Sequence, residues 1–216
     1  GPPRKPISFS FPQRTSLQTE PSRRAVLAAL TAAAALAPTG AAFALTEQAA
    51  SALVRRCIDE INTAENSGKT GAPLYRDFER IFERYADVPT IARYSLGPAA
   101  RTASRAELRN FTNAFTPYIA RKYGRRFREF IGGTIEINGA RTDRSLVIVE
   151  TTARLRGRSP FRTDFHVSDR SGSDKIFNVI VEGVNMLTTE RSEITAMLDA
   201  QGGSIPRLTQ ALGSVG

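Results

Sequence analysis

The chain has 216 residues, of which 41% are hydrophobic, and it carries a formal net charge of +9. This length is enough for one domain with a sizeable core. A single histidine and a single cysteine exclude a Cys/His metal cluster and an intramolecular disulfide. Residues 1–44 hold five of the bases and one acid, so the remainder keeps only +5, which is too little to indicate nucleic-acid binding.

The first 44 residues predict an export signal. Residues 1–21 are polar and proline-rich without periodicity, and we expect them to be disordered. Beyond them come an arginine pair, an apolar run and a small-residue site: Arg23-Arg24, residues 25–37 and Ala42-Phe43-Ala44. This order is typical of a signal cleaved after Ala44. The twin arginine resembles a Tat signal, with Sec export as the alternative. The remaining residues, 45–216, are expected to form a single domain.

Apolar residues then recur at the spacing of amphipathic helices. We expect one helix from residue 46 to about 66–68, a second over 73–86, and a short segment over 91–96 that stops at Gly97-Pro98. A long helix begins at Ser104, where Ser104 and Glu107 form a capping-box pattern. Cys57 lies on the apolar stripe of the first helix, so we expect a buried, unreactive thiol.

After Gly132-Gly133 the hydrophobic period changes to two, which is typical of strands. The first expected strand includes Ile135 and Ile137 and ends in a turn at Asn138-Gly139. Three more are expected over residues 146–155, 161–167 and 176–181, and the chain then returns to helix. Helices followed by consecutive strands predict an α+β fold, in which the N-terminal helices pack on a curved four-stranded antiparallel sheet.

The last of these strands leads into a glycine turn. Residues 175–181 crowd Ile, Phe and Val together, Gly183 breaks the strand, and apolar residues follow at Val184, Met186 and Leu187. We therefore expect the chain to pass from the sheet into a helix while staying buried. Such a corner suits the wall of a hydrophobic pocket.

Two groups of polar residues are candidates for function. Asp164, His166 and Ser168 project from one face of a strand, which would suit a base oriented by a carboxylate. The opposite face carries Phe161, Phe165 and Val167 and is the better candidate for the interior, so the polar trio is expected to face water. The sequence carries no phosphate-binding glycine loop, nucleophile elbow or carboxylate cluster with metal-ligand spacing.

The second group is a run of bases at the end of the long helix, namely Arg121, Lys122, Arg125, Arg126 and Arg128. Aromatic residues interleave with them, a pattern that also occurs in single-stranded nucleic-acid binding. A solvated helix end explains the run most simply, because cations near a helix C-terminus are favourable. Docking to an anionic membrane or an acidic partner is the alternative.

Aromatic residues are plentiful on the expected inner faces, with 12 Phe and 5 Tyr but no Trp. They could fill a solid core. They could equally line a small-molecule pocket, for which a domain of this size has room. Composition does not separate these alternatives.

Four segments, in order, resemble one known family. Tyr94-Ser95-Leu96-Gly97 with Arg101 is similar to its Leu-Gly-x-x-Trp-Arg turn, and the long helix has its Phe-x-x-x-Phe to Tyr pattern at Phe111, Phe115, Tyr118 and Tyr123. Residues 147–155 look like its Val-rich strand with a central Thr, here Thr151. Residues 175–187 are similar to its Trp-Lys-Val-x-Asp-Val strand leading into Val-x-Gly-Val-Ser. Over about residues 50–212 the chain thus resembles the MlaC, or toluene-tolerance, family of periplasmic phospholipid carriers, which includes a hopanoid-associated branch.

The resemblance implies an NTF2-like α+β domain that encloses lipid acyl chains in the periplasm. It implies a monomer without enzymatic activity or cofactor, whose cargo is phospholipid. Its implied partners are an inner-membrane MCE-protein ABC transporter and an outer-membrane lipoprotein complex, with no nucleic acid and no metal. Three alternatives stay open: a hopanoid or other hydrophobic cargo, an NTF2-like enzyme that uses His166, and a solid interaction module with a basic docking face.

The inner stripes and the matched segments together give the residues expected to contact lipid. They are Ile91, Leu96, Phe111, Phe115, Ile119, Phe130, Ile135, Phe165, Ile180, Val184 and Met186.

Overall fold

A computed structural model describes residues 44–128 and 131–215. The export signal expected over residues 1–44 therefore lies outside the described residues, apart from Ala44. Within the described part of the chain, no helix is both long and apolar enough to span a membrane.

Four helices and a 3₁₀ turn form the first half of the domain. They are α1 (Glu47–Glu65), α2 (Ala72–Tyr85), α3 (Val88–Ser95), η1 (Gly97–Arg101) and α4 (Arg105–Phe127). The expected capping box is confirmed, because Ser104 Oγ accepts from the Glu107 amide at 3.1 Å and the Glu107 carboxylate accepts from the Ser104 amide at 2.8 Å. These bonds satisfy backbone donors that have no partner inside the helix.

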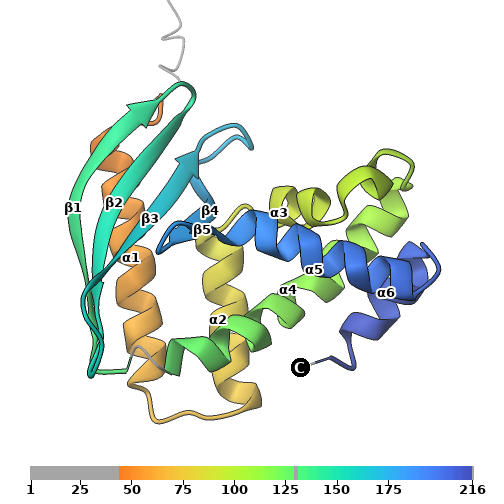
Figure 1. Ribbon diagram of the computed structural model, residues 1–216, viewed down its shortest axis with the longest axis horizontal. Helices are drawn as coiled ribbons and strands as arrows, with labels where there is room; N and C mark the ends of the chain where they lie inside the picture. Colours follow the sequence, from red (N-terminus) through yellow and green to blue (C-terminus); the bar gives the residue numbers. More distant parts are fainter. Residues whose placement is uncertain (1–43, 129–130, 216) are drawn as a thin grey trace, which may run out of the picture. The chain divides into compact units, whose positions relative to one another are not determined.

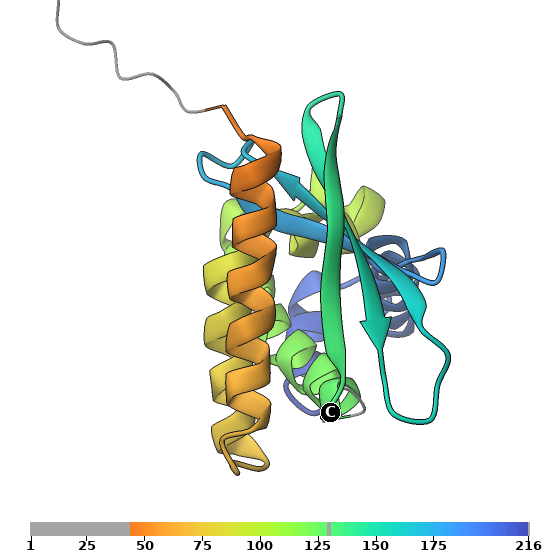
Figure 2. The same cartoon turned by 90° about the vertical axis from the view of Figure 1, so that its left-hand side faces the viewer.

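The second half is an antiparallel sheet followed by two helices (Figures 1 and 2). The sheet consists of β1 (Thr134–Asp143), β2 (Leu146–Arg154), β3 (Phe161–Ser168), β4 (Lys175–Val181) and β5 (Val184–Asn185), each paired with the next. Helices α5 (Met186–Ala200) and α6 (Ile205–Leu212) follow. The α+β architecture with consecutive antiparallel strands is confirmed, although the sheet has five strands where four were expected.

The turn expected at Asn138-Gly139 is wrong. Strand β1 continues through both residues to Asp143, and the register with β2 shifts by one between Ile137 and Gly139. This shift is a β-bulge, and a glycine without a side chain tolerates it readily. The Asn138 side chain donates to Thr152 Oγ1 across the strand pair at 2.7 Å instead of closing a turn. The true hairpin turn is Arg144-Ser145.

The corner after β4 also differs from the expectation. Glu182 and Gly183 both have positive φ, 51° and 81°, and they form a tight hairpin turn that returns the chain as β5. Two consecutive positive φ values match the right-handed twist of paired strands, and glycine adopts this conformation without strain. Val184 follows the turn with 54% of its surface exposed, so the chain does not stay buried at this point.

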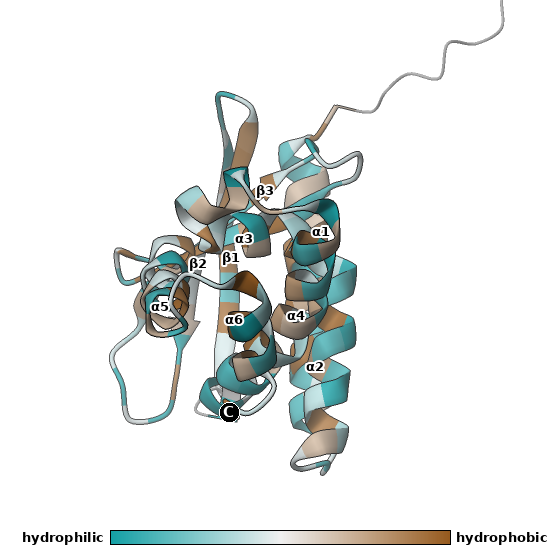
Figure 3. Cartoon of the chain, turned by 90° about the vertical axis from the view of Figure 1, so that its right-hand side faces the viewer, coloured by the Kyte–Doolittle hydropathy of each residue, from teal (hydrophilic) through white to brown (hydrophobic). Residues whose placement is uncertain are grey.

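Two separate apolar clusters make up most of the core. The first, here called the sheet-side core, joins α1 and α2 to the inner face of the sheet through residues such as Val54, Phe78, Val149 and Val167. The second, the helical core, joins α3, α4, α5 and α6 through residues that include Leu96, Phe111, Ile194 and Leu208. Figure 3 shows hydrophilic residues on the outward faces of α2 and α6. Phe82 packs against both cores, so the two meet at α2.

Helices α2 and α4 approach each other closely at Gly124. A Cβ atom on Gly124 would lie 2.8 Å from Phe78 Cδ2 and 3.1 Å from Tyr75 Cδ1. Phe78 is completely buried and Tyr75 contacts the same position, so a Cβ there would force both rings or the helix backbone to shift. The close approach explains a glycine inside a helix, where alanine is otherwise preferred by roughly 1 kcal/mol.

We therefore expect Gly124→Ala to lower the free energy of unfolding by about 1–3 kcal/mol through overpacking. Urea denaturation measures this loss. Gly139→Ala is a suitable control, because a Cβ there meets nothing within 4 Å and its φ is not positive. Equal stability of the two variants would contradict the role assigned to Gly124.

Candidate binding cavity

A cavity of about 350 Å³ lies between the sheet-side core and the helical core. This volume is near the lower end of the roughly 300–1,000 Å³ typical of small-molecule sites. Most of the lining is apolar, contributed by Ile58, Phe78, Ile81, Phe82, Tyr85, Val88, Ile91, Phe115, Ile119, Phe165, Ile176, Val179 and Val181. Aromatic residues such as Phe82 and Phe165 therefore line a cavity, whereas others such as Phe111 fill the core.

The strand register explains which side chains of the sheet reach the cavity. Phe165 on β3 pairs with Val179 on β4, and Thr163 pairs with Val181, so all four lie on the same face. All four line the cavity. Ile180 alternates with Val179 and Val181 and pairs with Asn185, which places it on the other face.

Six of the residues expected to contact lipid line this cavity, namely Ile91, Phe115, Ile119, Ile135, Phe165 and Met186. Leu96 and Phe111 are instead fully buried inside the helical core. Ile180 and Val184 are not among the lining residues either, because one lies on the opposite sheet face and the other is exposed. Phe130 lies outside the described residues.

None of the residues predicted to contact lipid lies on α1 or α2, although both helices line the cavity. Ile58, Ile81, Phe82 and Tyr85 lie at the amphipathic spacing of the two helices predicted from residue 46 and over 73–86, but this spacing does not distinguish a packed side chain from a cavity wall. The thiol of Cys57 also lines the cavity, and burial raises its pKa to about 12, with Glu60 adding to the effect. The expected burial of Cys57 is thus confirmed.

The exposed lining residues mark where the cavity meets solvent. They are Asn62 near the end of α1, Arg126 near the end of α4, and Arg158 in the β2–β3 connection. These three segments lie toward the lower end of the domain in Figures 1 and 2. We call Asn62, Arg126 and Arg158 the mouth residues. An apolar interior with cations at its opening suits an amphipathic anion.

Besides the exposed mouth arginines, one buried charged group lines the cavity. Glu190 on α5 is 3% exposed and lines the cavity together with Tyr123. Its Oε1 accepts from Lys122 Nζ at 2.6 Å and from the Tyr123 hydroxyl, and Lys122 also pairs with Glu193. Burial opposes the charged form of Lys122, but the hydrogen bonds to Glu190 and Glu193 outweigh it and raise its pKa. A buried carboxylate is tolerated here because a cation compensates it.

Two members of the predicted basic run therefore have structural partners. Lys122 pairs with Glu190, and Arg121 donates to the carbonyl oxygens of Leu212 and Val215 at 2.9 and 3.1 Å. The interpretation of the whole run as a solvated helix end is wrong for these two residues. Arg125, Arg126 and Arg128 are exposed.

A second carboxylate, Glu65, lies at the end of α1 close to Arg128. Burial raises its pKa from 4.5 to about 7, although attraction to Arg128 acts in the opposite direction. Neither carboxylate oxygen has a hydrogen-bond partner among the described residues. The folded protein thus binds this proton more tightly than the unfolded chain does, so the ionisation of Glu65 destabilises the fold as pH rises from about 4.5 to about 7.

We expect Glu65→Gln to remove this pH dependence. Glutamine resembles the protonated acid, so the variant should gain about 1–2 kcal/mol over the original protein at pH 8 and little at pH 4.5, after allowance for partial solvent screening. Urea unfolding of both proteins at the two pH values gives the difference. A gain in the free energy of unfolding that is the same at both pH values would contradict the raised pKa of Glu65.

His166 lies on the face of the sheet opposite the cavity and is not among its lining residues. Its ring centroid is 5.9 Å from that of Phe177. Burial against the strand lowers its pKa below 6.5 and Arg141 adds to this, while Asp164 and Asp143 oppose it. A base at this position does not reach a ligand in the cavity.

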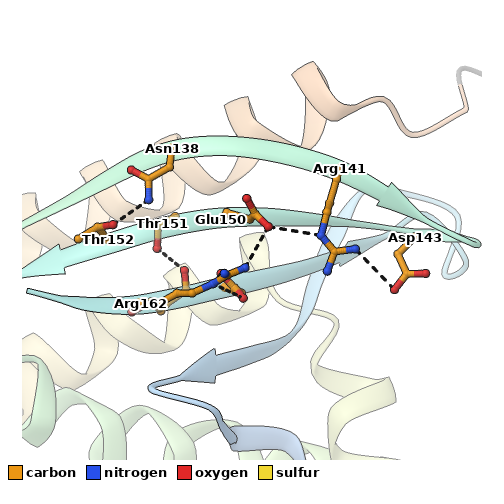
Figure 4. Close-up of polar contacts among 9 residues, drawn as sticks. Asn138, Arg141, Asp143, Glu150, Thr151, Thr152 and Arg162 are labelled. Carbon is orange, nitrogen blue, oxygen red and sulfur yellow. Dashed lines mark hydrogen bonds and ion pairs between the residues drawn. The ribbon is translucent and has the colours of Figure 1, made fainter.

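The sheet face that carries His166 also carries an ionic network, and Figure 4 shows its members Arg141, Glu150 and Arg162. Glu150 on β2 accepts from Arg162 Nη2 at 2.9 Å and from Arg141 Nε at 3.3 Å. Arg162 also donates to Asp164 at 2.9 Å. Cross-strand ion pairs of this kind are typical of a solvated sheet face. The Asp164 carboxylate is thus paired with Arg162, whereas the enzyme alternative needs it to orient His166.

No group of three or more His, Cys, Asp or Glu side chains in the described ranges is placed to hold a metal ion.

Comparison with known proteins gives an independent view of the domain. Its structure is similar to that of a phospholipid-binding protein from Ralstonia solanacearum, solved in complex with a phospholipid, with a TM-score of 0.62 and 16% sequence identity. The match covers 76% of this chain and 95% of that one. At this identity the likeness shows a shared fold. The family model described as MlaC protein matches residues 51–214, which is most of the chain, and the chain therefore belongs to the MlaC family.

Proposed function

We propose that this protein is a periplasmic phospholipid carrier that holds acyl chains in the cavity between its two cores. The observation that carries the proposal is the cavity itself, whose walls are apolar side chains from both cores. Each CH₂ group removed from water contributes roughly 0.8 kcal/mol, so acyl chains strongly favour such a site over the aqueous compartment. The headgroup would stay at the mouth residues.

Family membership and the phospholipid-bound neighbour support the choice of ligand. Within the cavity we assign lipid contact to Ile91, Phe115, Ile119, Ile135, Phe165 and Met186, all of which line it. We assign Leu96 and Phe111 to packing of the helical core. The protein would act as a monomer, without cofactor and without catalysis.

The finer part of the proposal concerns transport. The carrier would shuttle lipid between an outer-membrane lipoprotein complex and an inner-membrane MCE-type ABC transporter, the partners that the family resemblance implies. Export would depend on the signal expected over residues 1–44, with Tat as the proposed route.

The proposal is tested by native mass spectrometry of the protein exported into the periplasm of a Gram-negative host, followed by solvent extraction of bound molecules. We expect phospholipid at near one molecule per protein. A hopanoid or other polycyclic lipid in its place would keep the carrier but change the cargo. A mass equal to that of the bare chain under conditions that preserve the fold would contradict the proposal.

A further inference from the structure

The mouth of the cavity carries two guanidinium groups from different parts of the chain. Arg126 lies near the end of α4, and Arg158 lies in the connection between β2 and β3. Both line the cavity and both are exposed to solvent. An acyl chain carries no charge that a cation could pair with. Apolar ligand chains alone therefore do not account for two arginines at this position.

Both side chains contact aromatic rings of the cavity wall. The Arg126 guanidinium lies 5.9 Å from the centroid of the Tyr123 ring, and that of Arg158 lies 4.6 Å from the Phe161 ring. Tyr123 and Phe161 themselves line the cavity. A cation–π contact of this kind attracts a guanidinium to the ring without using its N–H donors, which remain available to an anion.

Acidic residues near the mouth occupy few of the N–H donors of Arg126 and Arg158. Arg126 makes no ion pair within residues 44–128 and 131–215. Arg158 donates through Nη2 to Glu182 at 2.9 Å, and both side chains of that pair are about half exposed. An exposed pair is weak, so an incoming anion can share or replace it. Guanidinium groups bind phosphate oxygens through paired N–H donors.

We infer that Arg126 and Arg158 together bind the phosphate group of a lipid whose acyl chains occupy the cavity, an inference that rests on the proposed carrier function. The two arginines form a phosphate site at the mouth and select lipids that carry this anion. A diacylglycerol with the same acyl chains fits the cavity equally well but leaves the arginines without a ligand. The headgroup is thus recognised by its phosphate, while the chains supply most of the affinity.

The test is competitive loading from vesicles that contain phosphatidylglycerol and diacylglycerol with identical acyl chains. Mass spectrometry of the extracted lipid gives the ratio of the two in the loaded protein and the total lipid per protein. We expect the original protein to favour phosphatidylglycerol, and Arg126→Gln/Arg158→Gln to lose about tenfold of that preference.

A matched control separates local recognition from general charge. Arg125→Gln/Arg154→Gln removes the same two charges from exposed residues of α4 and β2 that do not line the cavity. We expect it to keep the preference. An unchanged preference in the mouth variant, or an equal loss in the control, would overturn the inference. Absence of both lipids from the original protein would instead contradict the carrier function itself.

Discussion

Replacing Lys122 by methionine is expected to lower the free energy of unfolding by about 3–5 kcal/mol. The Lys122 side chain is 17% exposed and that of Glu190 only 4%, with Nζ and Oε1 2.6 Å apart. Methionine fills a similar volume but leaves the Glu190 carboxylate buried without its cation. The second oxygen of Glu190 already lacks a hydrogen-bond partner among the described residues, so the uncharged Tyr123 hydroxyl at Oε1 is left to compensate the charge. Urea denaturation at neutral pH measures the loss.

Two comparisons separate this effect from the loss of any lysine. Lys69 makes an ion pair with Asp77 at a similar distance, 2.7 Å, but its side chain is 48% exposed. Lys69→Met should therefore cost less than about 1 kcal/mol. The double variant Lys122→Met/Glu190→Leu should recover much of the stability, because an apolar pair replaces the charged one. If Lys69→Met and Lys122→Met lowered the free energy of unfolding by a similarly small amount, the role assigned to the buried Lys122–Glu190 pair would be contradicted.

The second large effect concerns the cavity. Val179 lies on the cavity face of β4, opposite Phe165, and is only partly buried by its neighbours. Val179→Trp should fill the space that a ligand chain would occupy. We expect bound lipid in the purified protein to fall at least about tenfold, since several buried CH₂ groups at roughly 0.8 kcal/mol each would be displaced.

Ile180→Trp is the matched control for this variant. Ile180 is the next residue of the same strand, is also partly buried, and lies on the other face of the sheet. We expect it to keep its lipid. Quantitative lipid extraction compares the two variants, and thermal unfolding shows that both remain folded. Normal lipid content in a folded Val179→Trp variant would exclude this cavity as the lipid site.

The architecture of the domain could be predicted because its signals are local. Ser104 and Glu107 determine where α4 begins, and the change of period after Gly132-Gly133 shows where the sheet begins. Four consecutive strand patterns after it predict an antiparallel sheet. These features depend on residues a few positions apart, which a single sequence displays directly.

The two local errors have a shared cause. Asn138-Gly139 is a typical turn sequence, and Gly183 is a typical break between a strand and a following helix, but pairing with neighbouring strands decides the conformation at each. At Gly139 the pairing with β2 accommodates a bulge, and at Gly183 the pairing of β4 with β5 produces a hairpin. Cross-strand register is a tertiary property that residue identity alone does not reveal.

The cavity could be predicted only in part for the same reason. Apolar periodicity identified Phe111 and Phe115 as inner residues of α4, yet Phe111 packs inside the helical core while Phe115 reaches the cavity. Which of the two side chains reaches the cavity depends on how α2, α4 and β4 are placed relative to one another. The Glu190–Lys122 pair joins residues 68 positions apart, and no local sequence pattern predicts it.

The absence of tryptophan from the sequence allows a direct test of where lipid binds. Phe82→Trp places a single fluorophore at the cavity wall, where it contacts both cores, and Ile180→Trp places one on the opposite face of the sheet. Each protein is loaded with phospholipid that carries bromine on its acyl chains, a quencher that acts only at close range. We predict strong quenching of the tryptophan fluorescence in the Phe82→Trp protein and little in the Ile180→Trp protein. Equal quenching of both, or quenching of the Ile180→Trp protein alone, would contradict acyl-chain binding in the cavity between the two cores.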